Sequence, residues 1–256
     1  MDQIITYEQP LNERMRTFLR LEQLMENFEH CLERDTSWDT HSALMLLLEI
    51  SNLAARVDLK SELMMELKRQ VVNMERLEQI PQVDSGRVRG IVERHNKLIA
   101  SLHGQSGQPG AELKSNEFLN SIRQRTIIPG GTCDFDLPAY HYWLCGPVAA
   151  RHGVLRTWIA PFTDIHAAIV DILALIRESA MPQRAHAVGG FYQQNLDPNQ
   201  PYQLIRILLG ANTGFYPEVS AGKHRFTVRF LQQPTPDNRG LPVNKDLDFA
   251  LACCAL

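Results

Sequence analysis

Apolar residues recur every three or four positions through the first part of the chain, which is the spacing of one buried face of an α-helix. Charged residues fill the positions between them and give each segment a solvated face. Short connections between long segments favour antiparallel neighbours. The pattern predicts helices from Leu11 to Leu32, from His41 to Val57 with Asp39 and Thr40 as N-caps, from Ser61 to Ile80, and from Asp84 or Ser85 to Leu102.

Beyond Pro182 the pattern changes to short runs rich in β-branched and aromatic residues, separated by Pro, Gly, Asn and Asp. No helical spacing interrupts these runs, so we expect an antiparallel sheet. The predicted strands are Gly189–Asn195, Tyr202–Gly210, Arg225–Phe230 and Leu247–Cys254. The helices expected between the two patterns are Ser115–Arg125, Pro138–Leu144 after an Asp136 cap, and Thr163–Ser179.

The two patterns together predict an α+β protein, in which an α-helical N-terminal domain precedes a β-rich domain with an antiparallel sheet and packed helices. The clearest break is "GQSGQPGA", from Gly104 to Ala111, because its residues leave helix and favour flexible connections. We therefore expect an α-helical domain over residues 1–112 and a β-strand domain over residues 113–256.

Composition narrows the class of protein. The chain has 256 residues, 44% of them hydrophobic, and a net charge of −3, which indicates a folded protein without the domain-wide basic field that duplex binding draws on. The N-terminus lacks the apolar run of a signal peptide, and "ALMLLL" at Ala43–Leu48 is too short to cross a bilayer. Five scattered cysteines suit reduced thiols. We expect a soluble cytoplasmic protein with no membrane partner.

The stretch "KHRFTVRF", from Lys223 to Phe230, concentrates basic residues in a slightly acidic chain. On a strand, Arg225 and Arg229 would point to the face opposite Phe226 and its apolar neighbours, about 13 Å apart. Such a row can be a solvated face, a guarded sheet edge or a docking surface for an anionic partner. Planar guanidinium groups held in this way could grip the carboxylates of an extended acidic peptide. The alternative is a nucleic-acid-binding module that uses the same basic strand face.

Candidate enzymatic chemistry is weak. "IIPGGTCDFD" lacks the spacing of a phosphate-binding loop, and capping or turn formation is the favoured role for Asp134 and Asp136. His141 and Cys145 stand four residues apart on an expected helix, but no second pair completes a zinc site. We expect no catalytic residue, metal or cofactor, and a hydrolase using Cys145 with His141 is the least favoured hypothesis.

Several segments together resemble the ZapD family of cell-division proteins. They are "YEQPLNERMRTFLRLEQL", "RQRTIIPGGTCDFDLPAYHYWL", "GFYQQN", "KHRFTVRF" and "LDFALACC", and the likeness runs nearly end to end. The resemblance implies an α-helical domain joined to a β-rich domain, a symmetric homodimer, and no catalytic activity or cofactor. It implies that the partner is the acidic C-terminal tail of FtsZ, and that the protein cross-links and bundles FtsZ filaments at the mid-cell division ring.

The resemblance also implies which basic residues bind the tail. Carried over by position, Arg20, Arg56, His141, Arg225 and Arg229 keep the basic type, and Lys223 joins them as a neighbour of the strand pair. One place departs from the expected pattern, because Asn116 and Glu117 stand where a relative is expected to offer another arginine. Whether Lys223 and His224 take part in binding stays open.

Overall fold

The computed structural model describes residues 3–256 apart from residues 57, 106, 234 and 236, and only the backbone of Arg56. Contacts between Cα atoms divide the chain into two compact units. The β unit comprises the chain up to Arg16 together with Leu173–Leu256, and the helical unit comprises Thr17–Ile172. The division therefore falls inside two helices, one near each end of the helical segment. The domain boundary expected at residues 112–113 stays a prediction.

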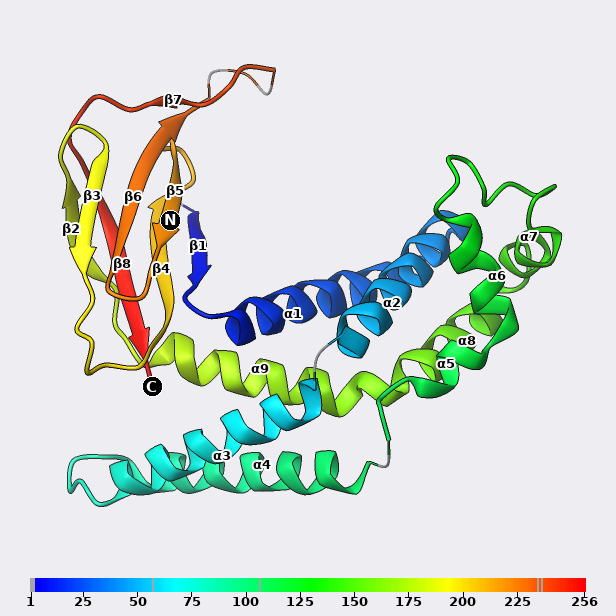
Figure 1. Cartoon of the computed structure of the whole chain (residues 1–256), viewed down its shortest axis with the longest axis horizontal. Coiled ribbons are helices and arrows are strands. Elements are labelled where there is room, and N and C mark those ends of the chain that lie inside the picture. The colour runs from blue at the N-terminus through cyan, green and yellow to red at the C-terminus, as the bar shows by residue number, and fades with distance from the viewer. Residues whose placement is uncertain (1–2, 57, 106, 234, 236) are drawn as a thin grey trace. The chain divides into compact units, whose positions relative to one another are not determined.

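Four long helices begin the helical unit, as the apolar spacing predicts (Figure 1). They are α1 (Glu13–Leu32), α2 (Ser37–Arg56), α3 (Leu59–Glu78) and α4 (Ser85–Gly104). Helices α3 and α4 form a hairpin, and their side chains at helical spacing are buried, including Leu63, Leu67 and Val88. A long helix of this kind is stabilised mainly by burial of one apolar face.

Side-chain caps mark the first residues of α4 and α2. Asp84 caps α4 as expected, because its carboxylate accepts hydrogen bonds from the backbone of Gly86 and Arg87 at 2.9 and 3.1 Å. The expectation for α2 is wrong by several residues. This helix begins at Ser37, and Thr36 Oγ1 accepts from Asp39 N at 3.1 Å. Asp39 returns the contact by accepting from the Thr36 hydroxyl, so its side chain belongs to a reciprocal cap at N3.

Shorter helices follow the hairpin: α5 (Ala111–Ser115), α6 (Glu117–Arg125), α7 (Pro138–Leu144), α8 (Val148–Ile159) and α9 (Thr163–Glu178). The apolar pattern does not single out α5 or α8. A single 3₁₀ turn, Ala160–Phe162, joins α8 to α9, and the run Val148–Glu178 is long and apolar enough to span a membrane by composition. Ile165, Ile169 and Ile172 on its inner face are buried at the spacing of a core helix, which is the packing expected inside a globular unit.

The β unit contains two antiparallel sheets, which confirms the α+β class and replaces one expected sheet by two. The first has the order β1-β4-β8-β2, and the second has the order β3-β6-β5 with β7 beside β6. The pattern missed β1, β2, β5 and β7. The strands are β1 (Ile4–Pro10), β2 (Gln183–Ala187), β3 (Phe191–Asn195), β4 (Tyr202–Gly210), β5 (Tyr216–Ala221), β6 (Arg225–Gln232), β7 (Leu241–Pro242) and β8 (Leu247–Ala255).

One apolar core lies between the two sheets and draws residues from β4, β6 and β8. Phe249 of β8 contacts Phe230 of β6 edge to face, with ring centroids 5.0 Å apart. Gly190, at φ +73°, closes one end, because a Cβ there would lie 2.0 Å from the carbonyl oxygen of Val243. This core holds one face of β6 inward and leaves its other face for the surface.

Candidate partner-binding surface

Strand β6 shows the predicted alternation. Phe226, Val228 and Phe230 are fully buried, while Arg225 and Arg229 are exposed on the other face. The strand lies between β3 and β5, so neighbours on both sides restrict the backbone of the arginines. Neither guanidinium group has an ion pair or side-chain hydrogen bond with any residue that the structure describes. The arginines are therefore held on a fixed strand with their charges directed to solvent.

The neighbouring strands set the chemistry around these arginines. Residues paired across antiparallel strands point to the same face, and their Cβ atoms lie about 4.5–5.5 Å apart. Arg229 is paired with Glu218 of β5 and with Phe191 of β3, and Arg225 is paired with Asn195 of β3. Glu218 is exposed beside Arg229 and lowers the positive potential of that end. The basic strand face predicted from the sequence therefore also carries an acidic residue beside Arg229.

Lys223 lies in the turn between β5 and β6, next to the start of the arginine row. The turn is closed by a hydrogen bond from Gly222 N to Arg225 O at 2.9 Å, and Leu196 N donates to His224 O at 2.8 Å. Lys223 and His224 are both exposed. The structure therefore brings Lys223, Arg225 and Arg229 together on one hairpin, and their role in binding stays a prediction.

The other candidates lie in the helical unit and on separate helices. Arg20 is exposed on α1, and His141 is exposed on α7 with Nε2 3.7 Å from Cys145 Sγ. Arg56 ends α2, and its side chain lies outside the described part of the structure. Helix α7 contacts the first turns of α2 through His41, whereas Arg56 is the last residue of α2. The α7 contact and Arg56 therefore lie about 22 Å apart along the axis of α2. The structure does not gather these three residues into one cluster.

Helix α7 is positioned by packing and by a buried hydrogen bond. Tyr140 is 1% exposed, and its hydroxyl lies 2.7 Å from His41 Nδ1. Burial raises the pKa of Tyr140 and lowers the pKa of His41, so both side chains are held neutral near pH 7. The predicted cap at Asp136 is wrong: α7 has no side-chain cap, and Asp136 instead pairs with Arg125 at 3.5 Å.

A buried arginine fixes the far end of α7. Arg151 of α8 is 5% exposed, and its Nη1 donates to the carbonyl oxygens of Leu144, at 2.9 Å, and Gly146. Its Nη2 donates to Asp35 O at 2.9 Å and its Nε to Thr40 Oγ1 at 3.1 Å. Sequence reasoning missed Arg151, because an arginine in an apolar helix gives no sign of the carbonyl groups it will contact.

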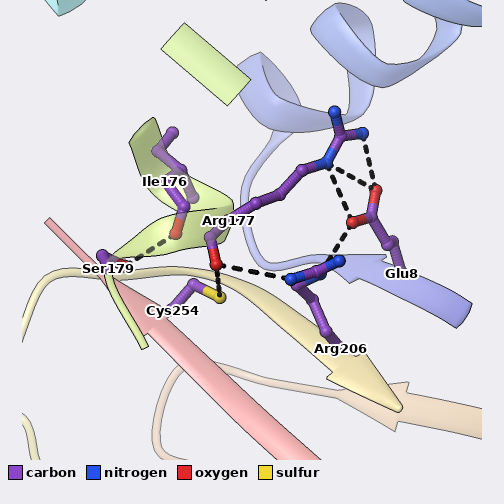
Figure 2. A network of polar contacts seen from close by, with 6 residues as sticks. All are labelled: Glu8, Ile176, Arg177, Ser179, Arg206 and Cys254. Atoms are coloured by element: carbon purple, nitrogen blue, oxygen red, sulfur yellow. Dashed lines mark hydrogen bonds and ion pairs between the residues drawn. The ribbon is translucent and has the colours of Figure 1, made fainter. Parts of the chain in front are cut away.

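A second network lies in the β unit and joins β1, α9 and β4 (Figure 2). Glu8 Oε1 accepts from Arg177 Nε and from Arg206 Nε, each at 3.0 Å, and Oε2 accepts from Arg177 Nη2 at 2.8 Å. Arg206 Nη1 also donates to the carbonyl oxygen of Arg177 at 3.3 Å. These arginines neutralise Glu8 and hold the end of α9 on the sheet, so they serve the fold.

Replacing Glu8 with glutamine should destabilise the β unit by about 1.5–3 kcal/mol, the range for hydrogen bonds to charged groups, because two half-buried guanidinium groups lose their anion. Urea unfolding followed by circular dichroism measures the change. Glu218→Gln is the matched control, since Glu218 is exposed and has no described partner; it should stay within about 0.5 kcal/mol of wild type. Equal stability of the two variants would contradict a structural role for the network.

Basic groups at the edge of the first sheet are also paired. Arg184 and His186 of β2 contact Asp248 of β8 at 2.5 and 2.9 Å. Hydrogen bonds from Arg184 and His186 lower the pKa of Asp248, and the same contact raises the pKa of His186. In contrast, no residue that the structure describes forms an ion pair with Arg225 or Arg229 of β6. Among the described residues, no group of three or more His, Cys, Asp or Glu side chains could hold a metal ion.

Comparisons with known proteins identify the family of this chain. The family model described as "ZapD: Cell division protein" matches residues 19–229. Full-length relatives named "Cell division protein ZapD" include those of Methylococcus capsulatus, 38% identical over 98% of both chains, and Cupriavidus necator, 40% identical over 98% of this chain and 99% of the relative. The protein of Coxiella burnetii is 36% identical over 98% of both chains.

The chain is therefore a cell-division protein without enzymatic activity, built from helices and two antiparallel sheets. It belongs to the ZapD family.

Proposed function

We propose that this protein binds the acidic C-terminal tail of FtsZ and, as a homodimer, cross-links and bundles FtsZ filaments at the mid-cell division ring in the cytoplasm. Membership of a cell-division family supports the setting. The observation that carries the proposal is the pair of exposed arginines on β6, because they are held on a fixed strand and have no described anionic partner.

The spacing of the arginines suits an extended peptide. Arg225 and Arg229 are four residues apart on one strand face, which corresponds to about 13 Å. An extended peptide has the same rise per residue, so two acidic side chains four positions apart would meet both guanidinium groups. Lys223, at the adjacent turn, would extend the row toward one end of the peptide. Glu218 would repel an acidic side chain placed over Arg229, which limits the strength of that contact.

Each such contact is weak on its own. Exposed ion pairs contribute about 0.2–1 kcal/mol each, so three of them supply at most about 3 kcal/mol, and one tail on one site is expected to bind more weakly than micromolar. A homodimer carries two sites, and a filament displays many tails. Binding of the second site is then governed by a high effective concentration, which turns weak contacts into durable cross-links.

The remaining candidates extend the proposal to the helical unit. Arg20, Arg56 and His141 are proposed to add basic contacts, but the separation of Arg56 from His141 means that a single extended peptide touching both would need about seven residues. Their contributions are therefore expected to be separable from that of the β6 row.

The proposed function is tested with the purified chain and a fluorescent FtsZ tail peptide. Fluorescence anisotropy should show weak, saturable binding at 50 mM salt that weakens several-fold at 300 mM, because exposed charges are screened beyond about 8 Å at physiological ionic strength. A peptide with its acidic residues changed to amides serves as the control and should bind at least about tenfold more weakly. Absence of binding at low salt, or equal binding of the control peptide, would contradict the proposal.

A further inference from the structure

A cleft with a volume of about 530 Å³ lies between α4 and the first turns of α9, inside the helical unit. Its apolar lining comes from Leu98 of α4 and from Ala167 and Val170 of α9. Pockets that bind small molecules measure about 300–1,000 Å³, are mostly apolar and are common between packed helices. The size, lining and place of this cleft are therefore those of a small-molecule site.

Two polar contacts join the helices on either side of the apolar residues. Arg94 Nε donates to Asp171 Oδ2 at 3.1 Å, and Ser101 Oγ donates to Asp164 Oδ2 at 2.5 Å. On each helix the two contact residues are seven positions apart, which corresponds to about 10.5 Å along the axis. The apolar part of the cleft lies between these contacts, so its length is fixed at both ends.

The cleft is preformed because α9 is held from its other side. Ile165, Ile169 and Ile172 are 0–2% exposed on the face of α9 opposite Ala167. The small side chain of Ala167 leaves the gap toward α4 open, and closing the gap would displace the buried isoleucines from a close-packed core. A site that already exists in the free protein loses little conformational freedom when a ligand binds.

The polar groups of the cleft favour an anionic ligand. Lys97 is exposed and forms no ion pair with any residue that the structure describes, whereas Arg94 is already paired with Asp171. His166 also lines the cleft, and its Nε2 is buried without a hydrogen-bond partner among the described residues. Buried polar atoms without a partner are uncommon and often mark the place of a bound water or ion.

We propose that the cleft between α4 and α9 binds a small amphiphilic anion. Its apolar body lies against Leu98, Ala167 and Val170, and its carboxylate or sulfonate group lies at Lys97. A partner helix of average length is about 17 Å long, so the distance between the two polar contacts is too short for one lying along the cleft. Anionic membranes are recognised by clusters of about four to eight Lys and Arg, and Lys97 is a single cation. This binding goes beyond the proposed function and does not depend on it.

The test uses the full chain and two fluorescent probes that share an aromatic body. Anilinonaphthalene sulfonate carries an anionic group, and phenylnaphthylamine is its uncharged counterpart. Titration of wild type with the sulfonate should show saturable binding with a dissociation constant on the order of tens of micromolar, as expected for a ligand of this size. Absence of saturable binding would overturn the inference.

Ala167→Leu fills the cleft and should weaken the binding of both probes at least about tenfold, because the new side chain occupies the space of the apolar body. Ala100→Leu is the matched control, since Ala100 is an exposed alanine of α4 outside the cleft lining. It should bind both probes as wild type does. Equal affinity of the Ala167→Leu variant and wild type would place the bound probe elsewhere and overturn the inference.

Lys97→Gln tests the charge and also serves if Ala167→Leu impairs folding, which circular dichroism detects. The variant should bind the sulfonate about two- to fivefold more weakly, the effect of one exposed ion pair, and the uncharged probe as wild type does. Lys68→Gln, at an exposed position of α3, is the control and should change neither affinity. An equal effect of Lys97→Gln on both probes, or none on either, would contradict an anion site.

The outcome is separable from that of the proposed function. The cleft variants leave β6 unchanged, so they should bind the FtsZ tail peptide as wild type does. Loss of tail binding, or of binding to anionic vesicles, in cleft variants that still bind the sulfonate normally would overturn the inference, since the cleft would then dock a peptide or a lipid surface. If wild type binds the sulfonate in the cleft but does not bind the tail, the cleft stands and the proposed function falls.

Discussion

Replacing Arg225 and Arg229 together with glutamate is expected to abolish the co-sedimentation of FtsZ bundles and to weaken tail binding at least about tenfold. Two exposed ion pairs contribute about 0.4–2 kcal/mol in all, and reversing both charges adds repulsion to that loss. Bivalent cross-linking depends on both sites of a dimer, so bundling falls more steeply than single-site affinity. The measurement is pelleting of FtsZ filaments at several salt concentrations.

The β unit should fold normally in this variant. Both arginines lie on the solvent face of β6, while the apolar side chains between them remain in the core. Glutamate at position 229 would face Glu218 across the strand pair and cost only about 0.2–1 kcal/mol. Circular dichroism and dimer mass should therefore match wild type.

A charge-matched control separates a specific site from a general field. Lys97→Glu with Arg156→Glu changes the net charge equally at exposed positions of α4 and α8, and this variant should bundle FtsZ nearly as wild type does. Full bundling by the folded Arg225 and Arg229 variant would exclude β6 as the tail site while leaving membership of the family untouched. Equal loss in both variants would indicate that net charge alone drives binding.

Replacing Arg151 with leucine is expected to destabilise the helical unit by about 3 kcal/mol. The guanidinium group is 5% exposed and donates to three backbone carbonyls and one hydroxyl, all of which would be left without this donor. Removing one partner of a buried polar group costs about 1–3 kcal/mol, and more when charge is involved. Thermal unfolding and urea unfolding measure the loss.

The control for this prediction is Arg156→Leu, on the same helix. Arg156 is exposed and has no described side-chain partner, so its replacement should change stability by less than about 0.5 kcal/mol. If the two substitutions cost the same, Arg151 does not hold the end of α7.

Only part of the candidate partner-binding surface on β6 could be predicted from the sequence. Alternation along "RFTVRF" indicated two faces because side chains on a strand have a period of two, which is a local property. The sequence does not predict Glu218 beside Arg229, because β5 lies in a segment rich in turn residues, whose composition favours a connection over a strand. The register between two strands depends on hairpin geometry and on packing in the core, and the sequence of one strand determines neither.

The other differences between the predicted and the observed structure also arise from contacts between residues that are far apart in the chain. Residues Ile4–Pro10 form β1 by pairing with β4, and the partners Glu8 and Arg206 are 198 positions apart in the chain. Asp136 looked like a helix cap, but Arg125 engages it from the end of α6. A carboxylate has several possible donors, and the one it meets depends on which helices come together.

The sequence by itself determined the long helices, the class of fold, the two faces of β6 and the likeness to a family, because periodicity and motif spacing act over a few residues. Only the tertiary structure decided that the β unit has two sheets, that Glu8 joins two arginines, and that Arg151 supports α7. Tertiary structure also decided that the candidate cations lie on separate elements of two units. Those features depend on contacts between residues far apart in the chain, which are selected by the burial of whole apolar faces and not by local preference.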